Sequence, residues 1–129
     1  MTTVDEIGAA KYVSLTTYRK DGTAVTTPVW QVASGGEVII VTEANSWKVK
    51  RIRNNSQVVV TVSDFRGRVA PGAASAKGEA RLLDEAGTVE ARALLARKYL
   101  MSRLGNGVAK LFHVRRPPMI GIVVTFPSP

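Results

Sequence analysis

Most of the first two-thirds of the chain consists of short β-branched segments separated by glycine-containing turns. The segments 12–18 and 24–33 flank Lys20-Asp21-Gly22. This tripeptide favours a tight turn, because glycine adopts positive φ easily and aspartate hydrogen-bonds to its own backbone. Strands joined by such short turns pair antiparallel. The order therefore excludes a Rossmann-type parallel sheet, in which strands alternate with helices.

Six strands and two helices are predicted in the order β-β-β-α-β-β-α-β. The third strand is a near-continuous apolar run, which indicates burial on both faces of a sheet. The segment 73–83 consists mostly of small residues and includes Gly78, so another backbone segment can approach it closely. The predicted strands are 12–18, 24–33, 37–42, 57–63, 73–83 and 119–126, and the predicted helices are 47–54 and 89–104, with a short helical piece at 108–113.

The length of 129 residues predicts one domain, spanning 1–129. Hairpin-linked strands with few helices predict a mainly β fold that is a closed or half-closed barrel, because closure removes exposed strand edges. The helix 89–104 contains no glycine or proline, and Gly105-Asn106-Gly107 follows it as a stop signal. Its predicted buried stripe consists of Leu94, Leu95, Tyr99 and Met101.

Pro28 interrupts the second predicted strand. Proline has no N–H to donate to a strand ladder, so we expect Pro28 at a sheet edge or at a bulge. Bulges often lie beside functional sites, whereas an edge strand needs no functional explanation. Both interpretations stay open on this feature.

The chain has no cysteine, and His113 is its only histidine. Disulfides, thiolate metal sites, thiol catalysis and multi-histidine metal sites are therefore excluded. No serine or threonine has an evident histidine partner, so a hydrolytic triad is not expected. We expect no catalytic side chain and no metal site. An enzyme of this kind takes its chemistry from a redox cofactor, which the protein binds and orients.

The net charge of +8 and the isoelectric point near 10.3 favour an anionic partner. Nucleic acid, a membrane surface and a polyanionic small molecule are the three candidates. The basic residues show no RNA-binding motif, so nucleic acid is the least favoured and we expect no nucleic-acid partner. A second basic group consists of Arg103, Lys110, Arg115 and Arg116. It is either a solubilising surface or a site for a long anionic tail. Contact with a membrane has no support beyond these residues.

Targeting and membrane-spanning segments are not expected. No stretch approaches the roughly 20 apolar residues that span a bilayer. The first ten residues carry two acids and no long apolar run, unlike a secretory signal. We therefore expect a cytoplasmic protein.

The segment 42–53 contains the strongest candidate for an anion site. Four cations fall within six residues at the start of the predicted helix 47–54, and Lys48 and Arg51 share one side of it. The hydroxyls of Thr42 and Ser46 and the free N–H groups of the helix start add hydrogen-bond donors. This combination predicts a phosphate site, although a solvated basic helix face explains the spacing equally well.

Three segments resemble the pyridoxamine 5′-phosphate oxidase-like superfamily, and within it the short flavin- or deazaflavin-dependent oxidoreductases of actinobacteria. They are KYVSLTTYRKDGTAVTTPVW at 11–30, VTEANSWKVKRIRNNSQVVV at 41–60 and GAASAKGEARLL at 72–83. The resemblance implies an FMN-binding-like split β-barrel that forms a homodimer, with two cofactor sites at the subunit interface. It implies coenzyme F420, a deazaflavin, as the cofactor, with FMN as the alternative.

The resemblance also implies roles for particular residues. Thr42, Ser46, Lys48 and Arg51 hold the cofactor phosphate, with Lys50 assisting, and the ring system is lined by Thr27, Pro28, Val29 and Trp30. The loop with Arg66 and Gly67 comes from the partner subunit or caps the site. The strand near 73–76 lacks the aromatic residue that some relatives place over the cofactor, so ring stacking and substrate choice stay open. The substrate contacts of the vitamin B6 oxidase have no counterpart here.

The expected function is F420-dependent oxidoreduction, with hydride transfer from the reduced coenzyme to an unsaturated or conjugated small molecule. An FMN-dependent oxidoreductase is the first alternative, because the same cations suit either cofactor. A non-catalytic carrier of a flavin or deazaflavin is the second, since a fold does not fix a function.

Overall fold

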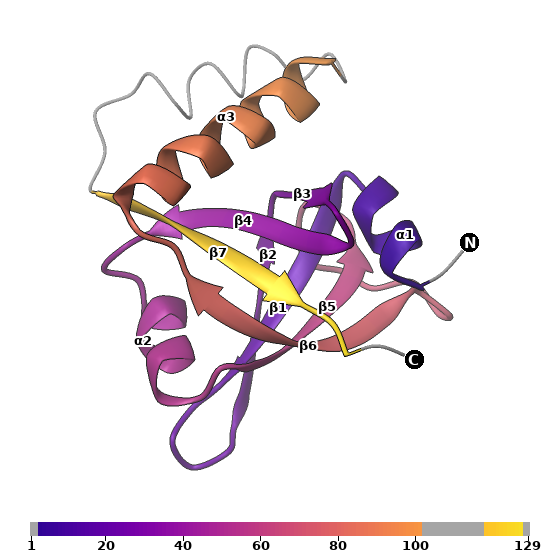
Figure 1. Cartoon of the computed structure of the whole chain (residues 1–129). Coiled ribbons are helices and arrows are strands. Elements are labelled where there is room, and N and C mark those ends of the chain that lie inside the picture. Colours follow the sequence, from indigo (N-terminus) through magenta and orange to yellow (C-terminus); the bar gives the residue numbers. More distant parts are fainter. Residues whose placement is uncertain (1–2, 102–117, 128–129) are drawn as a thin grey trace.

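The computed structural model describes residues 3–101 and 118–127 (Figure 1). Within these residues, seven strands form one antiparallel sheet in the order β2-β1-β5-β6-β7-β4-β3. This architecture confirms the predicted mainly β, antiparallel fold. The strands are β1 (Tyr12–Tyr18), β2 (Ala24–Val29), β3 (Gln31–Ser34), β4 (Glu37–Glu43), β5 (Gln57–Ser63), β6 (Ser75–Leu82) and β7 (Met119–Thr125).

The two end strands of the sheet, β2 and β3, are separated in sequence by Trp30 alone. β2 pairs with β1 (Val13↔Val29), and β3 pairs with β4 (Gln31↔Ile40). The link through Trp30 therefore brings the two ends of the sheet together and closes it into a split barrel. The prediction of one strand at 24–33, and so of six strands in all, is wrong, because the segment changes its pairing partner at Trp30.

The interior of the barrel is filled by aliphatic side chains. Alternate residues of β1, β4, β5 and β7 point inward, as the two-residue period of a strand requires. Each such side chain stabilises the fold by about 1.5–3 kcal/mol on leaving water. The core contains Val13, Leu15, Val38, Ile40, Val58, Val60, Ile122 and Val124, together with Ile7 of the helix α1 (Thr3–Ala9).

The outer face of β4 and β7 is covered by α3 (Glu85–Met101), which lies across both strands (Figure 1). Ile39 and Val123 on that face pack with Ala91 of the helix. β4 thus buries both of its faces, which confirms the prediction for 37–42. In the predicted buried stripe of this helix, Leu95 is buried and Leu94 is partly buried. The structure does not describe the side chains of Tyr99 and Met101.

One predicted helix has the expected bounds, a second begins earlier than predicted, and a third is not predicted. α2 (Trp47–Asn54) has the predicted bounds, whereas α3 begins at Glu85, before the predicted start at Val89. Asp84 explains the earlier start, because its Oδ1 accepts a 2.7 Å hydrogen bond from the N–H of Gly87. α1 is not predicted, since seven residues show little periodicity. Within the residues that the structure describes, no helix is long and apolar enough to cross a membrane.

Gly78 of β6 confirms the predicted close approach of a second backbone segment. A Cβ at this position would lie 2.8 Å from the carbonyl oxygen of Thr125 and 2.7 Å from Val124 Cγ1. The helical piece at 108–113, His113 and the basic group between Arg103 and Arg116 lie outside the described residues.

Candidate functional site

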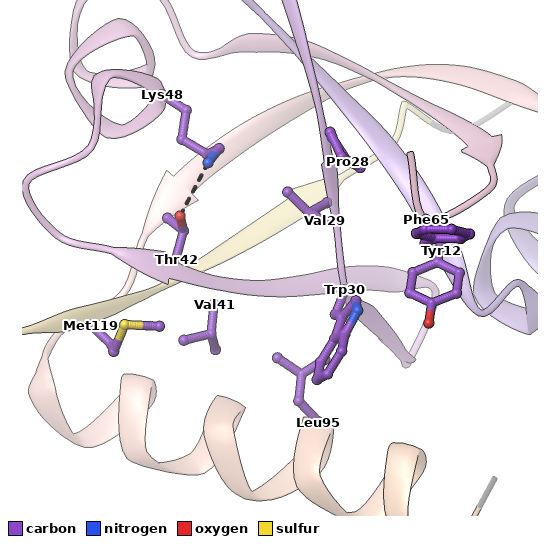
Figure 2. Close-up of a pocket in the computed structure, with 10 residues that line it drawn as sticks. All are labelled: Tyr12, Pro28, Val29, Trp30, Val41, Thr42, Lys48, Phe65, Leu95 and Met119. Carbon is purple, nitrogen blue, oxygen red and sulfur yellow. Dashed lines mark hydrogen bonds between the residues drawn. The ribbon is translucent and has the colours of Figure 1, made fainter. Parts of the chain in front are cut away.

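A cavity of about 480 Å³ lies where the end of β2, the end of β4 and α3 meet, and we call it the first cavity (Figure 2). Its volume falls within the range of small-molecule and cofactor sites, about 300–1,000 Å³. It is lined by Tyr12, Pro28, Val29, Trp30, Val41, Thr42, Lys48, Phe65, Leu95 and Met119.

The link between the two sheet ends forms one wall of the first cavity. Pro28 and Val29 end β2, which is an edge strand, so the prediction that Pro28 lies at an edge is confirmed. Trp30 follows them and packs against Leu95 of α3. The structure thus brings together three of the four residues expected to line a ring system. The fourth, Thr27, pairs with Leu15 and does not line the cavity.

An aromatic pair borders the same cavity and is not among the predicted site residues. The rings of Tyr12 and Phe65 are tilted by 59°, with their centroids 6.3 Å apart. Phe65 is 59% exposed in the single chain. No local signal reveals this pair in the sequence, because the two residues meet only when the loop after β5 folds back over the start of β1.

Asp64 holds the loop that carries Phe65. Its Oδ1 accepts hydrogen bonds from the backbone N–H groups of Arg68 (2.9 Å) and Arg66 (2.8 Å), and Arg68 Nε donates to its Oδ2 over 2.7 Å. The backbone N–H of Arg68, foremost among these donors, lowers the pKa of Asp64. Gly67 adopts a φ of +82° and lies against Pro28 of the same chain. The loop predicted to cap the site therefore borders the cavity of its own chain.

Lys48 gives the first cavity a cationic side. Its Nζ donates a 3.3 Å hydrogen bond to Thr42 Oγ1 at the end of β4. Burial lowers the pKa of Lys48, the nearby Arg51 lowers it further, and Glu43 opposes the shift. No carboxylate of the described residues forms an ion pair with Lys48. A half-buried cation that forms no ion pair within the described part of the chain suits an anionic ligand.

Ser46 is the residue before α2, but its hydroxyl makes no capping hydrogen bond. Its Oγ is buried and has no hydrogen-bond partner among the described residues. A buried hydroxyl without a partner costs about 1–3 kcal/mol. Ser46 thus offers an unused donor next to the start of α2, where free N–H groups favour anions. It does not itself line the first cavity.

Lys50 and Arg51 lie on another side of α2. They border a second cavity, of about 420 Å³, whose other lining residues are Tyr18, Arg19, Lys20, Trp47 and Asn54. The residues predicted to hold a phosphate are therefore divided. Thr42 and Lys48 face the first cavity, whereas Lys50 and Arg51 face the second.

Comparison with known proteins identifies the family of the chain. The family model described as pyridoxamine 5′-phosphate oxidase matches residues 2–123, whereas no curated protein matches the chain. Similar solved structures include a FAD-binding protein from Mesorhizobium loti, with 16% identity over 98% of this chain and 88% of that chain and a TM-score of 0.67. An F420 reductase shows 18% identity, coverage of 96% and 92% and a TM-score of 0.59. HutZ, the haem storage protein of Vibrio cholerae, shows 12% identity, coverage of 97% and 87% and a TM-score of 0.66.

At identities of 12% to 18%, the structural similarity shows the fold alone. The family is shown by the family model, which matches residues 2–123. The matched residues include β1 and β2, the Trp30 link, the segment that carries Lys48, and most of β7. The chain belongs to the pyridoxamine 5′-phosphate oxidase family.

Proposed function

We propose that this protein is an oxidoreductase that binds a flavin-type cofactor in the first cavity, with coenzyme F420 as that cofactor. The observation that carries the proposal is the polarity of the cavity. Lys48 and Thr42 lie at one side of it, and the rings of Trp30, Tyr12 and Phe65 lie at the other (Figure 2). A ligand with an anionic head group and a flat apolar ring system matches that arrangement.

Three side chains offer hydrogen-bond donors to the anionic head group. The Lys48 ammonium group supplies charge, the Thr42 hydroxyl orients it, and the unpartnered Ser46 hydroxyl lies two residues away at the start of α2. Charge-assisted hydrogen bonds of this kind contribute about 1.5–3 kcal/mol each. The residues present therefore fit a phosphate-bearing cofactor.

The first cavity offers an apolar surface to the ring system. Val29, Val41 and Leu95 line the cavity between the cationic side and Trp30, and they exclude water from the ring. β2 is an edge strand, so backbone N–H groups that face away from β1 are available to polarise a bound ring. A reduced deazaflavin bound here supplies a hydride to an unsaturated or conjugated small molecule. The protein contributes proximity and orientation.

Two alternatives use the same cavity. FMN also combines a phosphate with a flat ring, and the solved structures of similar fold include a FAD-binding protein as well as an F420 reductase. A non-catalytic carrier is the second alternative, since HutZ, which shares the fold, is a haem storage protein. Both alternatives use the cationic side and the aromatic side of the first cavity. The first differs from the main proposal in the cofactor that is bound, and the second differs in the absence of turnover.

We also propose that two chains pair, with the cofactor at their interface. Phe65 and Val69, in the loop beside the cavity, are 59% and 49% exposed in the single chain. A second copy that covers these side chains would remove them from water and enclose the open side of the site. Light scattering coupled to size-exclusion chromatography tests this pairing, and a protein that stays monomeric when saturated with cofactor contradicts it.

The test of the function is an equilibrium titration with coenzyme F420, FMN and haemin, followed by turnover assays with the reduced form of whichever flavin-type cofactor binds. We expect coenzyme F420 to bind most tightly and its reduced form to be oxidised by an unsaturated acceptor. Tight binding of FMN alone favours the first alternative. Tight binding without oxidation across a broad acceptor panel favours the carrier, and saturable binding of haemin alone contradicts the proposal.

A further inference from the structure

The second cavity has a composition that the proposed cofactor site does not use. Its lining residues come from α2 and the β1–β2 hairpin, and none of them lines the first cavity. Figure 1 shows α2 and this hairpin at the same end of the molecule. Four residues of the second cavity are cations, namely Arg19, Lys20, Lys50 and Arg51, and none is an acid. Its volume of about 420 Å³ falls within the range of small-molecule sites.

No acidic side chain lines the second cavity beside these cations. None of the four forms an ion pair with a carboxylate of the described residues. The nearest hairpin acid, Asp21, turns its Oδ1 to the backbone N–H of Thr23 at 2.9 Å, although it still attracts Arg19. Burial lowers the pKa of Arg51, and the charge of Arg19 lowers it further. Like charges kept this close in a concave site favour binding of an anion, which relieves their repulsion.

The donors are also partly fixed in place. Arg51 Nε donates a 2.6 Å hydrogen bond to Thr17 Oγ1, which anchors the guanidinium at its inner nitrogen. Lys50 Nζ lies 4.3 Å from the centroid of the Trp47 ring, so the indole holds the second cation by a cation–π contact. Trp47 is 70% exposed, an unusual position for an indole without a ligand or partner.

We propose that the second cavity is an anion site for a short chain of phosphate groups, separate from the cofactor site. Arg19 and Lys20 on the hairpin and Lys50 and Arg51 on α2 contact the phosphates from two sides, and Trp47 forms one wall. The chain of phosphates is either free or part of a nucleotide, since both present the same oxyanions to these donors. This site does not depend on the proposed function, because it uses no residue of the first cavity.

The experiment is calorimetric titration of the cofactor-free protein with inorganic tripolyphosphate, and in a second arm with ATP, at about 0.15 M ionic strength. The test variant carries Arg19→Gln and Lys20→Gln. The matched control carries Arg81→Gln and Arg97→Gln, which remove the same charge from exposed positions outside both cavities. A further variant, Lys48→Gln, removes the cation of the first cavity.

We expect saturable binding that the hairpin variant weakens about tenfold or more, while the surface control and Lys48→Gln change it less than about threefold. ATP that binds much more tightly than tripolyphosphate identifies a nucleotide, and equal affinity identifies the phosphate chain alone. An equal loss in the surface control shows only bulk charge and overturns the proposal. It is also overturned if wild-type protein shows no saturable binding, or if Lys48→Gln abolishes it.

Discussion

Lys48 Nζ donates a hydrogen bond to Thr42 Oγ1 over 3.3 Å, and this contact ties the first turn of α2 to the end of β4. Thr42 is 9% exposed, so the hydroxyl that orients the ammonium group is itself fixed by its surroundings. The cation is thereby positioned in the first cavity before any ligand arrives. Such preorganisation reduces the entropy that binding would otherwise cost.

Replacing Lys48 by alanine should weaken cofactor binding about tenfold or more, because one charge-assisted hydrogen bond contributes about 1.5–3 kcal/mol. Lys50→Ala is the matched control. It removes the same charge from the same helix, but from the side that faces the second cavity. Fluorescence titration measures both affinities. Equal losses in the two variants would mean that the helix acts by its overall charge rather than through Lys48.

Ser46→Ala should separate stability from binding. The Ser46 hydroxyl is buried without a partner and makes no capping hydrogen bond, so its removal should leave the free energy of unfolding unchanged within about 0.5 kcal/mol or raise it. The same change should weaken binding of a phosphate-bearing cofactor severalfold. Urea unfolding and a binding titration on one preparation measure the two effects.

Thr88→Ala provides the contrast for Ser46→Ala. Thr88 Oγ1 is buried and accepts a 2.9 Å hydrogen bond from the N–H of Gly121, and neither residue lines the first cavity. Its loss should cost about 1–3 kcal/mol of stability and leave cofactor affinity unchanged. A loss of stability in Ser46→Ala as large as that in Thr88→Ala would show that the Ser46 hydroxyl has a structural partner.

Much of the fold follows from sequence periodicity, and the exceptions have physical causes. The two-sided burial of β4 is visible in its apolar run, because an alternating strand would expose every second residue. The division at Trp30 is not visible, since β-branched residues lie on both sides of it and no turn residue separates them. Only pairing with β1 on one side and β4 on the other separates them, and pairing is a tertiary property.

The candidate site shows the same division between local and long-range information. Lys48, with its neighbours in 42–53, is a local pattern of cations and hydroxyls. Phe65 and Leu95 enter the first cavity from elements that are distant in sequence. Their chemistry is that of ordinary apolar residues, so the sequence offers no reason to select them. Spacing alone also places Lys48 and Arg51 together, whereas their side chains reach different cavities.

Lys98 should make the stability of the protein rise with pH over an alkaline window. Its Nζ donates to the carbonyl oxygens of Gln31 (2.8 Å), Ala10 (2.9 Å) and Gly8 (3.3 Å), and burial lowers its pKa from 10.5 to about 8. Between these values the unfolded state binds more protons than the folded state, so the cost of the buried charge disappears as pH rises from about 8 to 10.5.

The measurement for Lys98 is urea unfolding of wild type and Lys98→Met at about pH 7 and about pH 10. Subtracting the two proteins cancels the titration of other groups. The wild type should gain stability relative to the variant at the higher pH. A difference that stays constant, or that moves toward the variant, would show that the folded-state pKa of Lys98 is not lowered.

Gly78→Ala should destabilise the barrel by about 1–3 kcal/mol, because the added methyl group meets both Thr125 O and Val124 Cγ1 within 3 Å. Lys77→Ala, at an exposed position of the same strand, should change stability by less than about 0.5 kcal/mol. Chemical denaturation measures both. Equal stability of the two variants would show that Gly78 does not lie in close contact with Val124 and Thr125 of β7.

The most direct test of the central claim, that Lys48 holds the anionic head group of a flat cofactor, compares ligands with and without their phosphate. Affinities are measured for coenzyme F420 against its phosphate-free deazaflavin, and for FMN against riboflavin, with wild type and Lys48→Gln. In wild type, the phosphate should improve affinity about tenfold or more for the cofactor that binds, and Lys48→Gln should remove most of that gain. A phosphate preference that is equally strong in Lys48→Gln, or absent from wild type, would contradict the claim.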